Sequence, residues 1–551
     1  MFILIYLVGS PIIFLLVSSF KESGLPLDPG FTMANYSTVF KDPQVYKLFL
    51  NSIVFSIGSA GVAVFLGLAF AWLMERTNTP FRSISRVMII LPMATPPVLL
   101  AVSWVLLLSP QIGLFNKIIM DLFGLETAPL NVYSLVGMIF VQGLAFVPTT
   151  FLMLSPVFRN MDPALEEAAT ISGAGMLTLL RTIVLPILRP GILATSMFLF
   201  IVGLVVFEIP GIIGLPVRIL VFSSQIFFIT HPPSGMAEYG MVSALSMVYL
   251  IVIMTAGYVY FRMIKQGQNF TTITGKGYRP RAFSLGRWRY VSFSFFLLYF
   301  LFSIAAPLCV LFWTSLLPYY GKFSLEQIGL LSLENYSMIV QHPQVILAIK
   351  NTVIVAFSTA TVVTLFSAVV SWIVIRVKVK ASKLLDVLTF IPVGIPHIMM
   401  GLALTYVYLT FDFIPIYGTI WIIVVALSTH YISFGTRTMN GALFQIHREL
   451  EEASEVSGAT WLRTFVRITL PLIAPAIISV WIWVAGHSMR ELSAALMLAS
   501  GKNTVISTLL WGFWEGGELP ATAAVGVVLI MFLIVLLSVA QFIAHKARLS
   551  F

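Results

Sequence analysis

Apolar residues dominate this chain in long runs that are separated by short polar stretches. A helix needs roughly 20 apolar residues to cross the hydrocarbon core of a bilayer, and twelve stretches approach or exceed that length, six in each half. They lie near 1–19, 51–74, 87–108, 133–156, 187–208 and 240–261, and then near 290–316, 351–375, 387–410, 418–436, 472–498 and 521–544. The pattern predicts an all-α integral membrane protein, because helices satisfy their backbone polar groups internally.

Composition agrees with this prediction. Of the 551 residues, 59% are hydrophobic and 10% are charged, whereas soluble domains carry about 25% charged residues. The first apolar run follows Met1 directly, without the basic segment and small-residue cleavage site of a signal peptide. We therefore expect residues 1–19 to form a first span, with a signal peptide as the alternative.

The charged residues are distributed unevenly between the predicted loops. If both termini are placed in the cytoplasm, the loops on that side hold 23 of the 32 Lys and Arg but only nine of the 22 acidic residues. This is the positive-inside distribution of membrane proteins. The net charge of +10 therefore faces anionic membrane lipid. We expect no nucleic-acid partner, because the basic residues do not gather on one face.

Short motifs recur along the chain, which indicates a tandem duplication. Asn35-Tyr36-Ser37 recurs 300 residues later as Asn335-Tyr336-Ser337, and Asn51 recurs as Asn351. Later motifs are offset by 285 residues, because the first half is 15 residues longer between its third and fourth spans. Six spans return the chain to the same side, so the two repeats are parallel and related by a pseudo-two-fold axis along the membrane normal.

The duplication defines three regions. We assign 1–265 to the first repeat, 266–288 to a basic cytoplasmic linker and 289–551 to the second repeat. A translocation pathway between the two repeats is expected.

The cytoplasmic loop after the fourth span of each repeat, 158–190 and 437–471, carries the same motif. The two copies are Glu167-Ala168-Ala169 with Gly173-Ala174, and Glu452-Ala453-Ser454 with Gly458-Ala459. Asp162 and Pro163 suit the start of a helix, and Gly173 suits its end. The motif predicts a short helix, a break and a segment leading into the next span. An amphipathic helix on the membrane surface would explain one copy, but not two at matching places.

These loops resemble the EAA loop of permeases from binding-protein-dependent ATP-binding-cassette importers, and the wider pattern covers nearly the whole chain. The resemblance implies a type I importer permease fold with about twelve transmembrane helices, two copies of a separate ATPase and a periplasmic or lipid-anchored substrate-binding protein. It implies that the ATPase copies dock on Glu167, Ala168, Ala169, Gly173 and Ala174, and on Glu452, Ala453, Ser454, Gly458 and Ala459. Ser454 departs from the family's second alanine.

The sequence contains no Gly-x-x-x-x-Gly-Lys-Ser/Thr nucleotide-binding motif. ATP and Mg are therefore expected on the partner subunit, and we expect no catalytic residue and no cofactor on this chain. The resemblance also implies a bacterial cell (inner) membrane protein with both termini cytoplasmic.

Three phrases resemble the fused permeases of ferric-iron importers: Thr274-Gly275-Lys276-Gly277-Tyr278-Arg279-Pro280-Arg281, Phe207-Glu208-Ile209-Pro210 and Arg490-Glu491-Leu492-Ser493-Ala494-Ala495. Permeases for polyamine, thiamine, phosphonate, sulfate and molybdate share much of the pattern. The resemblance favours ferric iron, passed by alternating access, and leaves these other substrates open.

Two acidic residues lie at the ends of the fifth and eleventh predicted spans. An ionisable group at such a depth is a functional candidate, and carboxylates are hard oxygen ligands for a cation. We hypothesise that Glu208 and Glu491, with the neighbouring Arg490, line the translocation path; the metal ligands, if any, are unknown. Solvation of the helix ends, or an ion pair between Arg490 and Glu491, is the structural alternative. We expect His487 to be packed or hydrogen-bonded.

Other classes of protein fit less well. Twelve spans in two parallel halves also describe an ion-coupled secondary transporter, but that class leaves the duplicated loops unexplained. A membrane enzyme would need a catalytic or metal-ligand motif, and none is evident. Cys309, the only cysteine, excludes an intrachain disulfide, and its apolar neighbours predict a packed thiol.

Overall fold

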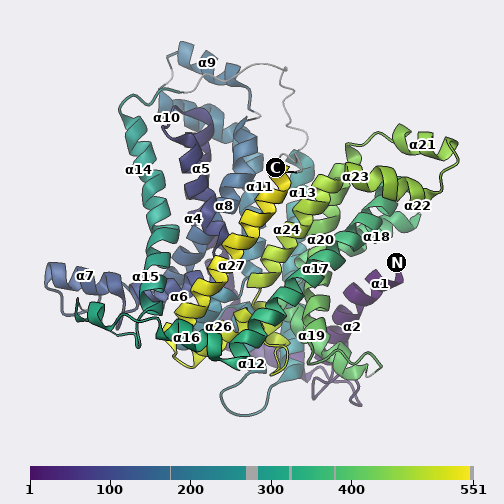
Figure 1. The fold of residues 1–551 in the computed structure, drawn as a ribbon, viewed down its shortest axis with the longest axis horizontal. Helices are drawn as coiled ribbons and strands as arrows, with labels where there is room; N and C mark the ends of the chain where they lie inside the picture. Colours follow the sequence, from purple (N-terminus) through teal and green to yellow (C-terminus); the bar gives the residue numbers. More distant parts are fainter. Residues whose placement is uncertain are drawn as a thin grey trace.

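The computed structural model describes residues 1–159, 161–173, 175–267, 283–321, 325–377, 380–411 and 413–546. Within these ranges the regular structure is helical, and the one extended pairing is an isolated bridge between Thr77 and Phe283. Long helices run through the middle of the molecule, and short helices lie at its upper and lower ends (Figure 1). The predicted all-α architecture is confirmed.

The helical segments of the first repeat are, in chain order, α1 (Phe2–Leu4), η1 (Ile5–Gly9), α2 (Ser10–Ser19), α3 (Ala34–Lys41), α4 (Pro43–Arg76), α5 (Arg82–Ile90), η2 (Leu91–Ala94), α6 (Pro97–Leu108), α7 (Leu114–Phe123), α8 (Leu135–Arg159), α9 (Pro163–Ile171), α10 (Met176–Leu179), η3 (Leu180–Val184), α11 (Leu185–Val205), η4 (Pro210–Gly214), η5 (Leu215–Val217), α12 (Phe222–Thr230) and α13 (Tyr239–Gly267).

Those of the second repeat are α14 (Trp288–Phe300), η7 (Leu301–Ala305), α15 (Ala306–Ser315), η8 (Leu325–Leu330), α16 (Glu334–Gln341), α17 (Pro343–Arg376), α18 (Lys380–Phe390), η9 (Ile391–Gly394), α19 (His397–Thr410), α20 (Ile420–Phe444), α21 (Glu449–Val456), α22 (Trp461–Thr464), η10 (Phe465–Thr469), α23 (Leu470–Leu472), α24 (Ala474–Arg490), α25 (Ser493–Met497), α26 (Ile506–Glu515) and α27 (Leu519–Lys546).

The duplication extends from the helices to individual hydrogen bonds. Asn35 Nδ2 donates to the carbonyls of Ser19 and Lys21 at 3.1 and 2.7 Å. Asn335 Nδ2 makes the same pair of bonds, to Ser315 and Leu317, at 2.9 and 2.7 Å. The repeated asparagines thus hold the short helices α3 and α16 to the ends of the first spans. The main difference between the repeats is α7, which occupies the longer loop predicted for the first.

Most predicted spans are single long helices, but some are bent. By length and composition, eight described helices can cross a membrane, and up to 12 spans result if each of four bent pairs is one span. The third span of each repeat is such a pair, with bends of 99° and 111° at Pro96 and Pro396. A proline cannot continue the helical hydrogen bonding, so the repeated prolines explain both bends.

Two segments differ from the predicted set of spans. The pair Pro210–Val217 and Phe222–Thr230 is bent by 66° and apolar enough to pass as a span, although we predicted a loop there. It connects the lower ends of α11 and α13, so it enters and leaves on one side as a re-entrant segment. Conversely, α20 fails the apolarity criterion, yet it packs along α17 as α8 packs along α4.

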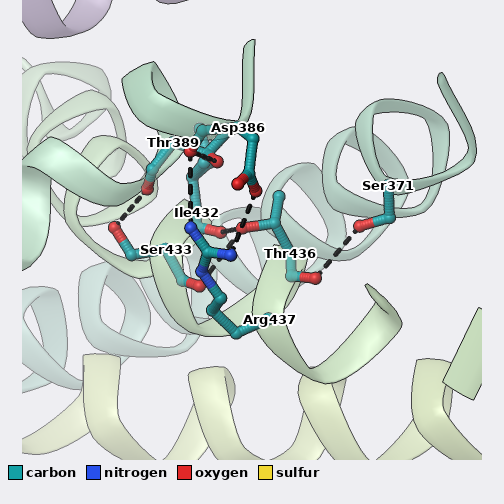
Figure 2. Close-up of polar contacts among 7 residues, drawn as sticks. All are labelled: Ser371, Asp386, Thr389, Ile432, Ser433, Thr436 and Arg437. Carbon is teal, nitrogen blue, oxygen red and sulfur yellow. Dashed lines mark hydrogen bonds and ion pairs between the residues drawn. The ribbon is translucent and has the colours of Figure 1, made fainter. Parts of the chain in front are cut away.

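The lower apolarity of α20 has a visible cause (Figure 2). Ser433 Oγ donates to the carbonyl of Thr389 at 2.6 Å, and Arg437 pairs with Asp386 at 3.0 Å. Ser371 Oγ of α17 donates to the carbonyl of Thr436 at 3.1 Å. Polar side chains of α20 therefore bind α18, and a polar side chain of α17 binds the backbone of α20.

The first span of each repeat packs on the other repeat. α2 lies between α13 of its own repeat and α19 of the second, and Phe14 meets Phe411 with ring centroids 5.4 Å apart. Symmetrically, α15 lies between α27 of its own repeat and α6 of the first. The two repeats are therefore interlocked through exchanged helices.

The chain between the repeats is anchored to the upper end of α4. The predicted linker is bracketed by α13 and α14, and residues 268–282, with the whole of the 274–281 phrase, lie outside the described residues. Phe283 donates its backbone N–H to the carbonyl of Arg76 at 2.8 Å, and Asn78 donates to Phe283 at 3.1 Å. The end of the linker is thus fixed beside the loop that follows α4.

Cys309 is exposed, so the prediction of a packed thiol is wrong. It shares an outward face of α15 with Phe312, which is 54% exposed. An apolar neighbourhood in sequence does not separate a core-facing residue from a lipid-facing one, because both environments are apolar.

α4 and α8 approach each other closely at glycines, and one of these glycines lies on the opposite helix in the second repeat. A Cβ on Gly67 of α4 would lie 2.5 Å from Thr150 Cγ2 of α8. In the second repeat the glycine is Gly435 of α20, where a Cβ would lie 3.0 Å from Ser367 Cβ of α17. At this position each helix pair therefore approaches closely through a glycine, carried by α4 in the first repeat and by α20 in the second.

We predict that Gly435→Ala destabilises the protein by about 1–3 kcal/mol, because the added methyl group overpacks the crossing. Adding Ser367→Gly should recover most of that loss, since it recreates the arrangement of Gly67 and Thr150. Thermal unfolding of the detergent-solubilised protein measures both effects. A double variant no more stable than Gly435→Ala would contradict the role given to this crossing.

Candidate functional site

The two predicted loop helices are present, as α9 and α21, and they lie at opposite upper corners of the molecule (Figure 1). Asp162 Oδ1 accepts the backbone N–H of Ala164 at 2.9 Å, which is the predicted N-cap. Gly173 and Gly458 follow the two helices with φ of +82° and +80°, a backbone conformation that favours glycine. The glycines therefore end both helices, as predicted.

The predicted docking residues in these loops differ in their exposure. Glu167 lies in α9, and Ala174 lies outside the described residues. The exposed members are Ala168, Gly173, Glu452, Ala453 and Gly458, and the half-buried ones are Ala169, Ser454 and Ala459. The Ser454 hydroxyl lies 2.9 Å from Thr464 Oγ1, so the residue that departs from the family pattern connects α21 to α22.

A further pair of residues on these helices was not identified from the sequence. Ile171 and Val456, which are equivalent at the offset of 285, are 88% and 89% exposed. Both repeats thus expose one large apolar side chain at the same place on the loop helix. The sequence does indicate this pair, because both residues directly precede the Ser-Gly-Ala that ends each motif.

At the interface between the repeats, side chains from the ends of α11 and α24 meet. We define the seam as the contact between Met93, Glu208 and Thr230 of the first repeat and Arg490, Ser493 and Met497 of the second. Aromatic rings close it on one side: Trp511 of α26 has its ring centroid 5.3 Å from those of both Phe207 and Phe227.

One seam contact marks the pseudo-two-fold axis. Ser493 Oγ donates to Glu208 Oε1 at 3.0 Å, and these residues are equivalent at the offset of 285. Residues related by a two-fold operation can meet each other only at the axis. Glu208 therefore lies at the axis between the two repeats.

Arg490 also crosses the seam. Its Nη1 donates to the carbonyl of Met93 at 2.5 Å, and its Nη2 lies 2.6 Å from His487 Nε2. Since a guanidinium group only donates, Nε2 is the acceptor, and His487 Nδ1 carries the proton that bonds the Trp483 carbonyl at 2.8 Å. His487 also stacks on the Trp483 ring at 3.6 Å. The prediction of a packed and hydrogen-bonded histidine is confirmed.

Glu491 has a different environment from Glu208. It is 7% exposed, and its carboxylate accepts the backbone N–H groups of Ala494 at 2.9 Å and Ala495 at 3.3 Å. These contacts cap the start of α25, whereas Glu208 is half-buried and bonded across the seam. The structure thus brings Glu208 and Arg490 to the seam and uses Glu491 as a helix cap.

Histidines gather only loosely in the second repeat. The rings of His397 and His430 lie 3.7 Å apart. Among the described residues, however, no group of three or more His, Cys, Asp or Glu is arranged to hold a metal ion. These histidines therefore read as packed side chains.

The chain matches one family model twice, once in each repeat. The family is described as "Binding-protein-dependent transport system inner membrane component", and the matches cover residues 63–267 and 360–549.

Two individual relatives match most of the chain and a third matches part of it. The Ferric transport system permease protein FbpB of Actinobacillus pleuropneumoniae is 25% identical over 92% of this chain and 72% of its own. The Fe(3+)-transport system permease protein FbpB 2 of Haemophilus influenzae is 22% identical over 89% of this chain and 88% of its own. The Sulfate transport system permease protein CysT of Salmonella typhimurium is 28% identical over 38% of this chain and 80% of its own.

Among solved structures, a bacterial ABC transporter involved in the import of the acidic polysaccharide alginate matches with 19% identity and a TM-score of 0.39. The match covers 47% of this chain and 94% of that chain.

The two acidic residues should respond differently to truncation. We predict that Glu491→Ala lowers the midpoint of thermal unfolding more than Glu208→Ala, because it strips two buried N–H groups of their acceptor at about 1–3 kcal/mol. Glu208→Ala removes the acceptor of the Ser493 hydroxyl at 3.0 Å and of one backbone N–H, that of Phe207 at 3.3 Å, but from a half-buried carboxylate. Equal midpoints for the two variants, measured in detergent, would contradict the capping role of Glu491.

Proposed function

The chain belongs to the family of binding-protein-dependent transport system inner membrane components, and we propose that it passes ferric iron from a substrate-binding protein to the cytoplasm by alternating access. It is a multi-pass inner-membrane permease with the type I ABC importer fold rather than an enzyme. We place the ATP chemistry on a separate subunit.

The paired loop helices are the observation that carries the coupling part of the proposal. One exposed helix per repeat, each with a projecting apolar residue, presents two equivalent docking sites. We propose that a copy of the ATPase binds each of them, around Ile171 and Val456 and the motifs at 167–174 and 452–459. Small residues allow close approach, and Glu452, which is about half exposed in its pair with Arg448, is accessible to a basic group of the partner.

The seam carries the transport part. We propose that the substrate passes along the pseudo-two-fold axis at Glu208, and that the contacts of Arg490 with Met93 and of Ser493 with Glu208 close the path in the conformation described. The loop-helix side is then cytoplasmic, with both termini on that side, and the binding protein docks on the opposite side. ATP binding would move α9 and α21 toward each other and part the seam.

Ferric iron is favoured by the relatives and by the seam. The ferric permeases match nearly the whole chain, whereas the sulfate permease matches 38% of it. Oxygen atoms also converge on the seam, from the Glu208 carboxylate, the Ser493 hydroxyl and the Met93 carbonyl. Oxygen donors suit hard cations.

Sulfate is the second candidate, and a specific observation favours it. Arg490, supported by His487, places a guanidinium group at the same seam, and guanidinium groups bind oxyanions through paired hydrogen bonds. Ferric iron would bind the Glu208 carboxylate, whereas sulfate would bind the Arg490 guanidinium group.

Reconstitution with its partner ATPase and substrate-binding protein tests the substrate. We expect ferric iron to stimulate ATP hydrolysis and uptake, and Glu208→Gln to lower iron uptake at least about tenfold through loss of the charged acceptor. The glutamine still accepts the Ser493 hydrogen bond, so the seam is otherwise preserved. Stimulation by sulfate, with uptake lost in Arg490→Gln, would instead establish the second candidate.

Docking is tested by co-purification. We expect Ile171→Asp combined with Val456→Asp to abolish recovery of the ATPase, because a charge would enter an apolar contact. Glu167→Lys combined with Glu452→Lys should weaken recovery less. Met236→Asp is the matched control, since Met236 is 94% exposed but lies in the loop between α12 and α13, at the other side. Retention of the ATPase by the double Asp variant would refute this docking surface.

A further inference from the structure

An arginine at the upper end of α4 holds the first cytoplasmic loop. Arg76 Nη2 donates to the carbonyl of Met161 at 2.6 Å, and its Nε lies 3.7 Å from Glu166 Oε1 of α9. The Arg76 side chain is only 3% exposed. The loop helix is thus attached to the second span as well as to the spans that flank it in sequence.

The second repeat reproduces this attachment. Arg376 Nη2 donates to the carbonyl of Ile446 at 3.0 Å, and its Nε lies 3.0 Å from Glu451 Oε2 of α21. The arginines are equivalent at the offset of 300, and their partners at 285. Glu451, 8% exposed, also accepts the Thr469 hydroxyl at 2.9 Å. The same contact in both repeats argues against a chance pairing.

The opposite ends of the same two helices hold the segments near the seam. Ser52 Oγ of α4 accepts the backbone N–H of Phe222 at 2.9 Å, at the start of α12. Its counterpart Thr352 Oγ1 of α17 accepts the N–H of Ile506 at 2.8 Å, at the start of α26.

The repeated asparagines lie beside these contacts. Asn51 Nδ2 donates to the carbonyl of Leu220 at 3.2 Å, and Asn351 Nδ2 donates to that of Thr504 at 2.9 Å. The segments held in this way carry the rings of Phe227 and Trp511, which close one side of the seam.

α4 and α17 are also better suited to transmit movement of the loop helices than the spans that follow these loops in sequence. Each is a single α-helix of 34 residues, about 50 Å long at 1.5 Å per residue, with its only proline at the first position. By contrast, the loops lead into α11 and α24 through π-helical turns, and the second of these spans is bent by 72°. A continuous helix transmits an axial displacement with less loss than a broken one.

We propose that Arg76 and Arg376 are positioning residues that make α4 and α17 the rods by which movement of the loop helices reaches the seam. The inference rests on the proposed function and adds a transmission route to it. Separating the two partners of a buried ion pair is unfavourable, because an uncompensated charge is left behind. Each arginine therefore fixes its loop helix relative to the rod. Asn51, Asn351, Ser52 and Thr352 are the contacts at the far end.

The experiment compares two arginines of the second repeat in the complete transporter with its ATPase and binding protein. Arg376→Gln removes the attachment of α21 to α17. The matched control is Arg437→Gln, which breaks an ion pair of the same length, 3.0 Å to Asp386, between α18 and α20 (Figure 2). That pair does not involve the loop helix. ATPase co-purification, ATP hydrolysis and substrate uptake per ATP are measured for each.

We expect Arg376→Gln to retain the ATPase and its hydrolysis but to lose at least about tenfold in uptake per ATP, in line with the loss of a charged buried contact. Arg437→Gln should match the unmodified chain. Unchanged uptake per ATP in Arg376→Gln, an equal loss in Arg437→Gln, or loss of the ATPase from Arg376→Gln would each overturn the proposal.

A variant at the far end of the rod keeps the test decisive if Arg376→Gln fails to fold. Thr352→Ala touches no loop residue, yet it should reduce uptake per ATP with the ATPase still bound, whereas Thr352→Ser should behave normally because Ser52 stands at the equivalent position. Normal coupling in Thr352→Ala would overturn the transmission route. Failure of the unmodified chain to retain any ATPase would instead refute the proposed function.

Discussion

The structure depends on satisfying backbone polar groups where water is absent. Continuous helices do this alone, but the bent spans and the re-entrant segments do not. Side chains of α4 and α17 supply the missing partners: Ser52 and Thr352 accept N–H groups, and Asn51 and Asn351 donate to carbonyls. The two longest helices are therefore bound to the least regular parts of the chain, which also lie closest to the axis.

The two repeats share a duplicated scaffold, but the charged residues at the seam between them are not duplicated. The asparagine clamps, the proline bends, the loop helices and the arginine attachments all occur twice. The seam does not follow this rule, because Glu208 meets a serine at the equivalent position and Arg490 corresponds to Val205. Identical charges facing each other across an axis would repel. Divergence of the repeats therefore allows one acid and one base to occupy the pathway together.

The features predicted from the sequence are those encoded locally. Apolar length predicted most spans, and Asp162 and Gly173 predicted the ends of a loop helix. The interpretation failed where the outcome depends on distant partners. The apolar 210–230 segment bends back rather than crossing, α20 uses polar side chains to bind α18, and Cys309 faces outward. The pairing of Arg76 with Glu166 joins residues 90 positions apart, and the capping role of Glu491 follows from the turn at α25, which no pattern indicated.

The exchanged first spans have a consequence for synthesis of the chain. α2 reaches its place between α13 and α19 only after residues near 400 have been made. At typical translation rates of 5–20 residues per second, the first helix therefore waits about 20–80 seconds before its last neighbour emerges. During that interval its core-facing residues, including Leu15, must be shielded by lipid or by the insertion machinery. Biogenesis of the first half cannot be completed before most of the second half exists.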